Sequence, residues 1–207
     1  MFPERIETDR LVLERLCHEN VAVSELYDLL ADDEDVREAL EHVPQTPYQT
    51  MKEAHDKIEK TEEHWADRDV ATYAVRPDDD EDGAGKLAGT TSLSCKWERQ
   101  TAQFGLILMK PFWGRGYSGE RAAALMELAF DQLDFELVSA GYNEGNEKSK
   151  RAIEKYVDTF DGQYDGVLRN RVPMEEGIDD LHVYTIMKEQ YNQATKSQDT
   201  QCRFIYG

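Results

Sequence analysis

The chain has 207 residues, a length that suits one domain with a sizeable hydrophobic core. Its 43 acidic and 24 basic residues give a net charge of −19, and the acids are spread along the whole chain. This balance argues against nonspecific nucleic-acid binding, which needs a basic face, and a hydrophobic content of 40% argues against disorder. Because concentrated salt screens repulsion within such a diffuse acidic surface, we predict a halophilic protein; an ordinary acidic protein that selects cationic partners is the alternative.

The cysteines and the amino terminus indicate where the protein resides. Cys17, Cys95 and Cys202 lie far apart and form no C-x-x-C pair, which predicts neither a disulfide framework nor a metal site. The charged start, residues 1–5, lacks the apolar core of a signal peptide. No apolar run approaches the ~18 residues of a membrane-spanning helix. We therefore expect a cytoplasmic protein without bound metal or membrane contact.

The first half of the chain predicts alternating strands and helices. In chain order these are a strand over 6–13, helices around 23–30 and 36–40, a helix opened by residues 46–49, and strands over 72–75 and 87–93. Thr46 and Gln49 form a capping box with Pro47 at the first helical position, so we expect the third helix to begin there. Residues 77–85 between the two strands read as a polar, glycine-rich hairpin tip exposed to solvent.

The second half continues the α/β order. It predicts a strand over 103–109, a helix to about residue 133, a strand over 135–141, a helix from Asn146, and closing strands over 167–169 and 182–187. We therefore expect an α/β fold of the α+β type in a single domain over residues 1–189. Residues 190–207 are polar and aperiodic, which predicts a loose carboxyl-terminal tail.

The most informative segment is an apolar strand, residues 106–109, followed by a turn with three glycines over 113–119 and then by a helix. A glycine turn at a helix start leaves several backbone N–H groups unpaired at the positive end of the helix dipole. This predicts an anion site, typically one for phosphates.

Read as Gly114-x-Gly116-x-x-Gly119, the turn matches the fingerprint of dinucleotide-binding proteins. That motif also needs an acidic residue at the end of the next strand, whereas the acid of this strand, Glu136, lies near its start. A Walker loop is excluded, because no Lys-Ser or Lys-Thr follows the glycines. A nicotinamide-dinucleotide-binding protein is thus the less favoured interpretation.

The same turn resembles the pyrophosphate loop Gln/Arg-x-x-Gly-x-Gly/Ala of the GNAT acetyltransferases. Residues 113–120 are similar to the loop of the RimJ/RimL-like branch, with Trp113 in the Gln/Arg position and Ser118 in the small final one. Three more segments are similar to that branch in the same order, namely residues 6–13, 87–93 and 146–149. The chain is identified on these matches as a RimJ/RimL-like GNAT protein, which implies a mixed, mostly antiparallel sheet flanked by helices.

The resemblance implies acetyl-CoA as cosubstrate and assigns residues to it. Beside Trp113, the backbone amides of five residues would bind the pyrophosphate: Gly114, Arg115, Gly116, Tyr117 and Ser118. The pantetheine arm would pair, like an added strand, with the edge formed by Leu106, Ile107 and Leu108, and an amide of that strand would polarise the thioester carbonyl. Asn146 would orient coenzyme A or the helix start, and Ser149 would also lie at the cosubstrate.

Acetyl transfer needs a proton donor for the leaving thiolate. Many GNAT enzymes have a tyrosine at the position of Ile153, so the resemblance leaves Ser149 as the candidate donor. A role as helix N-cap explains this serine equally well. Tyr156 is an alternative donor.

Acetyl transfer also needs a base for the amine. The glutamate that many relatives use is Gln103 here, and an amide cannot take a proton. Asp180 and His182 share one face of the last predicted strand with Tyr184, which makes the first two the candidate bases; that face is equally well explained as the polar outer side of the sheet.

We therefore predict an acetyl-CoA-dependent N-acetyltransferase in which a primary amine attacks directly, without a covalent enzyme intermediate. The resemblance suggests a protein N-terminal α-amine as acceptor, such as that of a ribosomal protein, although the branch also includes enzymes that act on small amines and drugs. We expect the helices of the first seventy residues and the loop over 171–179 to set acceptor specificity. Because of Gln103, a catalytically degenerate acetyl-CoA sensor or scaffold is the alternative. No nucleic acid is expected as a direct partner, and the oligomeric state is left open, a homodimer included.

Overall fold

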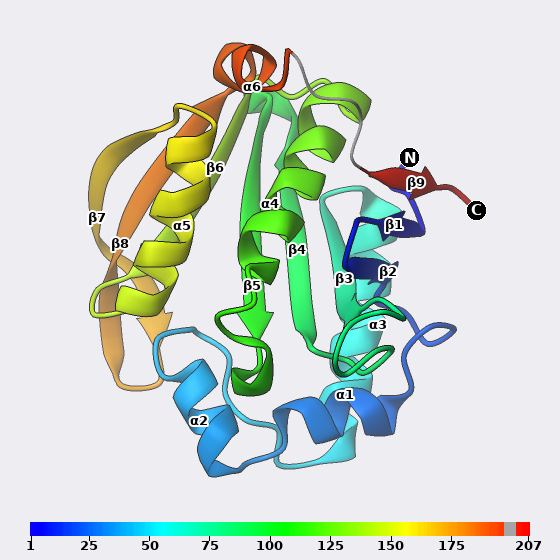
Figure 1. Ribbon diagram of the computed structural model, residues 1–207. Helices are drawn as coiled ribbons and strands as arrows, with labels where there is room; N and C mark the ends of the chain where they lie inside the picture. Colours follow the sequence, from blue (N-terminus) through cyan, green and yellow to red (C-terminus); the bar gives the residue numbers. More distant parts are fainter. Residues whose placement is uncertain (197–201) are drawn as a thin grey trace.

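A computed structural model describes residues 1–196 and 202–207 (Figure 1). Within these residues, one nine-stranded sheet has the order β7-β8-β6-β5-β4-β3-β2-β1-β9. Its strands are β1 (Arg5–Glu7), β2 (Leu11–Arg15), β3 (Val70–Pro77), β4 (Gly89–Lys96), β5 (Thr101–Leu108), β6 (Leu137–Asn143), β7 (Gln163–Met174), β8 (Gly177–Met187) and β9 (Arg203–Ile205). Neighbouring strands are antiparallel, except that β5 and β6 are parallel.

Six α-helices flank the sheet within the described ranges, which confirms the predicted fold class. They are α1 (Val23–Leu30), α2 (Glu34–Leu40), α3 (Met51–Asp67), α4 (Tyr117–Glu127), α5 (Glu147–Thr159) and α6 (Lys188–Thr195), and a π-helical turn, Leu128–Gln132, extends α4. Helices α4 and α5 lie side by side in front of the sheet, and α1 and α2 lie beyond the end to which β5 points (Figure 1).

Two predictions near the amino terminus are wrong in detail. The single strand expected over 6–13 is a hairpin of β1 and β2, because Thr8 turns the chain: its hydroxyl accepts from the Leu11 amide at 3.0 Å. Helix α3 begins at Met51 rather than at residues 46–49. The segment before it is extended, since the Tyr48 amide donates to the Leu30 carbonyl at 2.8 Å and this tertiary contact outweighs the local capping signal.

The tail also differs from the prediction. Among its described residues, 190–195 belong to α6 and Arg203–Ile205 form β9, which pairs with β1 at the edge of the sheet. The Tyr191 ring packs 5.0 Å from Phe130, and its hydroxyl donates to Asp131 at 2.9 Å. Only a few side chains anchor this polar segment, so its composition did not indicate that it is ordered.

The feature that positions the site is the separation of β5 from β6. The two strands pair only at Thr101↔Leu137, Ala102↔Val138 and Gln103↔Ser139. From Phe104 onward β5 stays paired with β4 but has no partner on the β6 side among the described residues. The second half of β5 therefore offers one free backbone edge inside the sheet, as the predicted pantetheine site requires.

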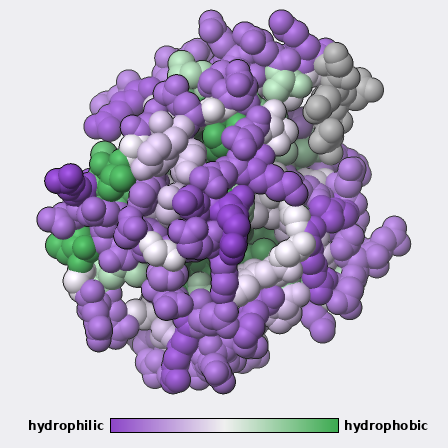
Figure 2. Space-filling model, turned by 60° about the vertical axis from the view of Figure 1, so that its left-hand side comes forward, coloured by the Kyte–Doolittle hydropathy of each residue, from purple (hydrophilic) through white to green (hydrophobic). Residues whose placement is uncertain are grey.

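The surface agrees with the acidic composition. Figure 2 shows mostly hydrophilic residues on the side that carries α5 and β7, with hydrophobic residues visible in a few small places. Exposed apolar side chains on the β7–β8 hairpin include Val167, Leu168 and Ile178. In the part of the chain that the structure describes, no helix has the length and apolar character needed to cross a membrane.

Candidate active site

The turn after β5 has the backbone of an anion site. Gly114 and Gly116 have φ values of 75° and 83°, left-handed conformations that favour glycine, and Gly116 is the N-cap of α4. Within residues 1–196 and 202–207, none of the five amides over 114–118 donates to a protein acceptor, whereas the Gly119 and Glu120 amides bond back to the Gly116 carbonyl. Five free donors at the positive end of a helix can bind a phosphate group, and we call residues 114–118 the anion cradle.

One local contact and one contact between segments far apart in sequence hold this turn in place. Trp113 Nε1 donates to the Leu108 carbonyl at 2.6 Å, which fixes the turn to the end of β5. Arg10 Nη1 donates to the Arg115 carbonyl at 2.9 Å, and Glu120 of α4 forms an ion pair with Arg10 at 2.6 Å. These contacts fix the backbone of the turn relative to β5 and α4.

The hairpin tip over 77–85 is not simply exposed to solvent, as the sequence predicted. Its Asp82 carboxylate pairs with Arg115 at 3.0 Å, and its Glu81 carboxylate accepts from the Tyr117 hydroxyl at 2.7 Å. The guanidinium of Arg115 thus faces an aspartate rather than open solvent. The backbone of the turn remains available for an anion, while the charge of Arg115 is shared with Asp82.

The geometry argues against the dinucleotide interpretation. In that fingerprint the third glycine is needed because helix and strand pack closely. A Cβ added at Gly119 would have no atom within 4 Å, so nothing there requires glycine. The strands next to β5 and the turn also form a mixed sheet rather than a doubly wound parallel one.

The start of α5 lies beside the same turn. Lys148 Nζ is 4.1 Å from the centre of the Trp113 ring, and Lys148 and Lys110 both pair with Glu38 of α2, at 2.7 and 2.8 Å. These two lysines lower the pKa of Glu38 to about 2. The loop after β5, helix α2 and the first turn of α5 therefore meet at one place.

The structure separates the two roles considered for Ser149. Asn146 is the N-cap of α5, and its Oδ1 accepts from the Ser149 amide at 3.0 Å. Ser149 is therefore not the cap, and its half-buried hydroxyl has no hydrogen-bond partner within the described ranges. This leaves the hydroxyl available to a ligand, and its role as proton donor stays a prediction.

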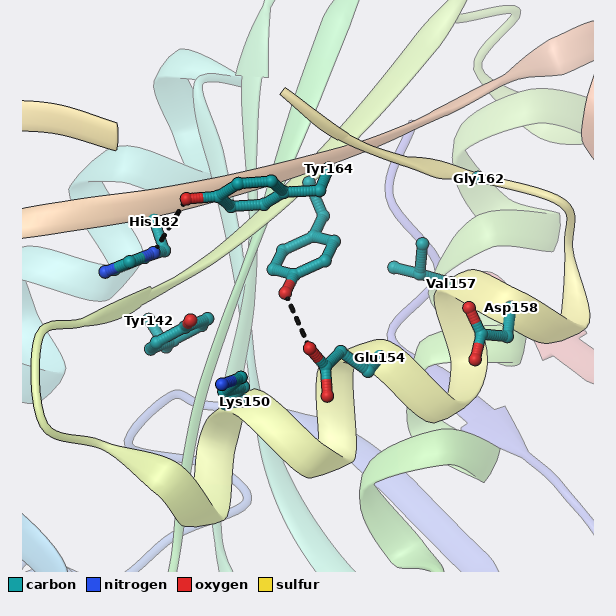
Figure 3. A pocket seen from close by; sticks show the side chains of 9 residues that line it. Tyr142, Lys150, Glu154, Val157, Asp158, Gly162, Tyr164 and His182 are labelled. Carbon is teal, nitrogen blue, oxygen red and sulfur yellow. Dashed lines mark hydrogen bonds between the residues drawn. The ribbon is translucent and has the colours of Figure 1, made fainter. Parts of the chain in front are cut away.

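His182 lies in a groove between α5 and the neighbouring strands, which we call the tyrosine groove. It has a volume of about 530 Å³, and its lining includes Tyr142, Tyr164, Tyr184, His182 and Glu154. Figure 3 shows Tyr142, Tyr164 and His182 on the strand side and Lys150 and Glu154 on α5. The His182 ring stacks on Tyr142 with 4.5 Å between ring centres.

The hydrogen bonds of His182 determine which nitrogen carries its proton. Its Nε2 is 2.5 Å from a Glu144 carboxylate oxygen, and its Nδ1 is 2.9 Å from the Tyr164 hydroxyl. A carboxylate only accepts, so Nε2 carries the proton and Nδ1 accepts from Tyr164. The tertiary structure thus gives the neutral His182 ring an orienting carboxylate at Nε2 and a hydrogen bond from a hydroxyl at Nδ1.

Asp180, the other candidate base, and Gln103, at the usual glutamate position, have surroundings that differ from those of His182. Asp180 and His182 share a face of β8, as predicted, but the Asp180 carboxylate accepts from the Asn170 amide of β7 at 2.8 Å. No hydrogen bond joins Asp180, His182 and Ser149 to one another in the described part of the chain. Gln103 is exposed on β5, at the last pair before the strands separate.

A second groove, about 370 Å³ in volume, lies between α2 with its following loop and the turn that joins β7 to β8. We call it the acidic groove because its lining includes Glu41, Glu175, Glu176 and Asp179. Arg37 also lines it, but Asp32 binds this guanidinium with both carboxylate oxygens at 2.7 and 2.9 Å. The structure thereby brings together the two segments that the sequence predicted for acceptor specificity.

Sequence reasoning missed a buried cation. Arg121 of α4 is 3% exposed, and its guanidinium carbon is 5.6 Å from the centre of the Phe104 ring. Across from it on α5, burial raises the pKa of Tyr156 to about 12, and the charge of Arg121 opposes this effect. The signal was present in the sequence, because Arg121 lies four residues before Leu125 and thus on the apolar face of the helix.

The mixed sheet, the free edge of β5 and the anion cradle at α4 together suit an enzyme that binds a phosphate-bearing chain along a strand. A family model for the acetyltransferase (GNAT) domain matches residues 10–156, and the chain belongs to this family. It is therefore an acetyl-CoA-dependent acetyltransferase. The uncharacterized protein YkkB of Bacillus subtilis is 29% identical over 154 residues, which are 73% of this chain and 83% of YkkB.

Solved structures share the fold. The microcin C7 self-immunity acetyltransferase MccE, in complex with acetyl-CoA and AMP, has a TM-score of 0.73 at 16% identity, covering 86% of this chain and 93% of that one. A candidate ribosomal-protein-serine acetyltransferase from Vibrio cholerae has a TM-score of 0.71 at 17% identity, covering 90% and 99%. At these identities the likeness shows the common fold alone.

Proposed function

We propose that the protein transfers the acetyl group of acetyl-CoA to a primary amine by direct attack. The amine nitrogen attacks the thioester carbonyl carbon, a C–N bond forms, and the C–S bond breaks with its electron pair leaving on sulfur. The amine gives up a proton and the thiolate takes one. The observation that carries this proposal is the row of five free amides over 114–118 next to the unpaired edge of β5, which suits a phosphate-linked chain lying along the strand.

The cosubstrate contacts follow from this arrangement. The amides over 114–118 would bind the pyrophosphate, and Leu106, Ile107 and Leu108 would pair with the pantetheine arm. Trp113 and Asn146 would hold the turn and the start of α5 in position, as they do without ligand.

The acidic groove is the proposed entrance for the acceptor. An amine is mostly an ammonium ion at neutral pH, and a groove lined by Glu175, Glu176 and Asp179 attracts such a cation. A protein N-terminal α-amine, as the resemblance to the RimJ/RimL-like branch suggests, is the acceptor that we favour. The Vibrio cholerae neighbour is likewise named for a protein substrate.

Three side chains are proposed for the proton transfers. His182 would accept the amine proton through the Tyr164 hydroxyl, since its Nδ1 already accepts from that hydroxyl and Glu144 stabilises the resulting imidazolium. Asp180 stays the second candidate base. Ser149 would donate to the leaving sulfur through its unpartnered hydroxyl.

The net charge of −19 supports two proposals about habitat. We infer a halophilic protein that works in the cytoplasm. Salt shortens the Debye length to about 3 Å at 1 M and thereby weakens the repulsion between the many carboxylates of the folded chain. Unfolding midpoints between low and molar salt test this inference. They should rise with salt, and a flat or falling profile contradicts halophilic adaptation.

The experiment that tests the function combines binding with turnover. Calorimetry with acetyl-CoA, coenzyme A and NAD should detect binding of the first two ligands. Release of free thiol with a panel of amines and N-terminal peptides, with mass spectrometry of the products, should then identify an acetylated amine. Binding without thiol release for any acceptor would favour the alternative of a sensor or scaffold. That alternative exists because Gln103 has an amide, which cannot take a proton, at the usual position of the glutamate base. Binding of NAD alone would overturn the proposal.

A further inference from the structure

The first turns of α4 hold a cation inside the protein. Arg121 Nε and Nη1 are buried and find no hydrogen-bond acceptor within residues 1–196 and 202–207. No carboxylate pairs with this guanidinium in the same part of the chain, and burial lowers its pKa from the ordinary value. A guanidinium nevertheless stays protonated in proteins. A buried charge without a counter-charge is unfavourable, and an electron-rich ligand group beside it would remove that cost.

The position of Arg121 indicates which group that is. Its guanidinium lies over Phe104, the first residue of β5 after the last pair with β6. It thus lies at the closed end of the separated strands, and its charge acts on Tyr156 of α5, the helix that packs beside α4. The anion cradle is about one helical turn away, at the start of the same helix. A pantetheine arm that begins at the cradle and follows the free edge of β5 brings its thioester end toward Arg121.

We propose that Arg121 is a catalytic residue that stabilises the negative charge developed by acyl transfer. This inference rests on the proposed function. Attack by the amine moves the carbonyl π pair onto oxygen; its return breaks the C–S bond, whose pair leaves on sulfur. The guanidinium balances both charges, stays protonated throughout and transfers no proton. The thiolate takes its proton from Ser149 or from water after the bond has broken.

Physical reasons favour this role. A fixed cation in a site without water acts on developing charge more strongly than one in solvent, and needs no reorganisation during the reaction. The family's donor tyrosine is replaced by Ile153, and a cation at the sulfur makes protonation during bond breaking less important. The other arginines at the turn are already paired, Arg10 with Glu120 and Arg115 with Asp82.

The test compares Arg121→Gln, which removes the charge, with Arg151→Gln, which removes an exposed arginine from α5 and changes the net charge equally. Calorimetry measures acetyl-CoA affinity, thiol release measures kcat, and ultraviolet titration follows the thiol of bound coenzyme A. We expect Arg121→Gln to bind acetyl-CoA within a few-fold of wild type and to lose roughly 10²- to 10³-fold in kcat. The bound thiol should ionise at a lower pH in wild type and Arg151→Gln than in Arg121→Gln.

A purely structural role predicts other results. Arg121→Gln removes an unpartnered buried charge, so the ligand-free variant should unfold at the wild-type temperature or above; a fall of several degrees overturns the inference. Arg121→Lys keeps the charge and should regain part of the lost kcat. If both wild type and Arg121→Gln bind acetyl-CoA and the bound thiol ionises at the same pH in both, the role of Arg121 is overturned. The proposed function then stands. Absence of acetyl-CoA binding in wild type overturns the proposed function and this inference together.

Discussion

The glycine at the start of α4 allows a quantitative test of the anion site. Gly116 has a φ of 83°, and this conformation costs an L-residue about 1–2 kcal/mol, with more for a β-branched side chain. A Cβ there would also lie 3.4 Å from Arg10 Nη2, on the guanidinium that holds the Arg115 carbonyl. Gly116→Val therefore either strains the turn or rotates it, and rotation turns the amides over 114–118 away from a phosphate.

The magnitude can be read from thermal unfolding with and without acetyl-CoA. At about 100 times its dissociation constant the ligand adds about 2.7 kcal/mol to wild type, which raises Tm by about 5–11 °C in a chain of this size. If Gly116→Val weakens affinity about 100-fold, the same concentration adds only about 0.4 kcal/mol, a shift under about 2 °C. We also expect a drop of about 2–8 °C in the Tm of the free variant.

Gly119→Ala is the matched control. The added Cβ meets no atom within 4 Å, and the helical position favours alanine by up to about 1 kcal/mol. This variant should be at least as stable as wild type and should keep the full ligand shift. A full ligand shift in Gly116→Val would refute the assignment of the turn as the pyrophosphate site.

Three further predictions concern the proton transfers, the fixing of the turn and acid stability. Combined Asp180→Ala and His182→Ala should lower kcat about 10²-fold with acetyl-CoA affinity retained, and unchanged turnover would remove both candidate bases. Glu120→Ala should lower the free energy of unfolding by about 2–3 kcal/mol, because Thr8 and Arg10 lose their acceptor; an unchanged urea midpoint would contradict this. The pKa of Glu38 is lowered from 4.5 to about 2, so its contribution to stability is complete above pH 4.5 and disappears as the pH falls toward 2. Glu38→Gln should flatten that part of the pH–stability curve, and an identical acid limb would argue against the pairing with the two lysines.

The glycine turn after β5 shows what the sequence by itself determined. Its signals are local, because the strand over 106–108, the left-handed glycines and the start of α4 are neighbours in the chain. Backbone preferences and apolar periodicity act over a few residues, so they identify such a segment without knowledge of the fold. Helices α1, α2 and α5 were predicted on the same kind of evidence.

Only the tertiary structure decided the remaining features. Pairing of Asp82 with Arg115 joins residues 33 positions apart, and the acidic groove joins α2 to the β7–β8 turn. The chain end docks as β9 because β1 offers it a free edge, and the start of α3 shifts because Tyr48 pairs with Leu30. The sequence places Arg121 on the apolar face of its helix, but only the packed structure shows that its guanidinium is buried. Long-range packing and desolvation contribute these energies, and they exist only after distant segments have come together.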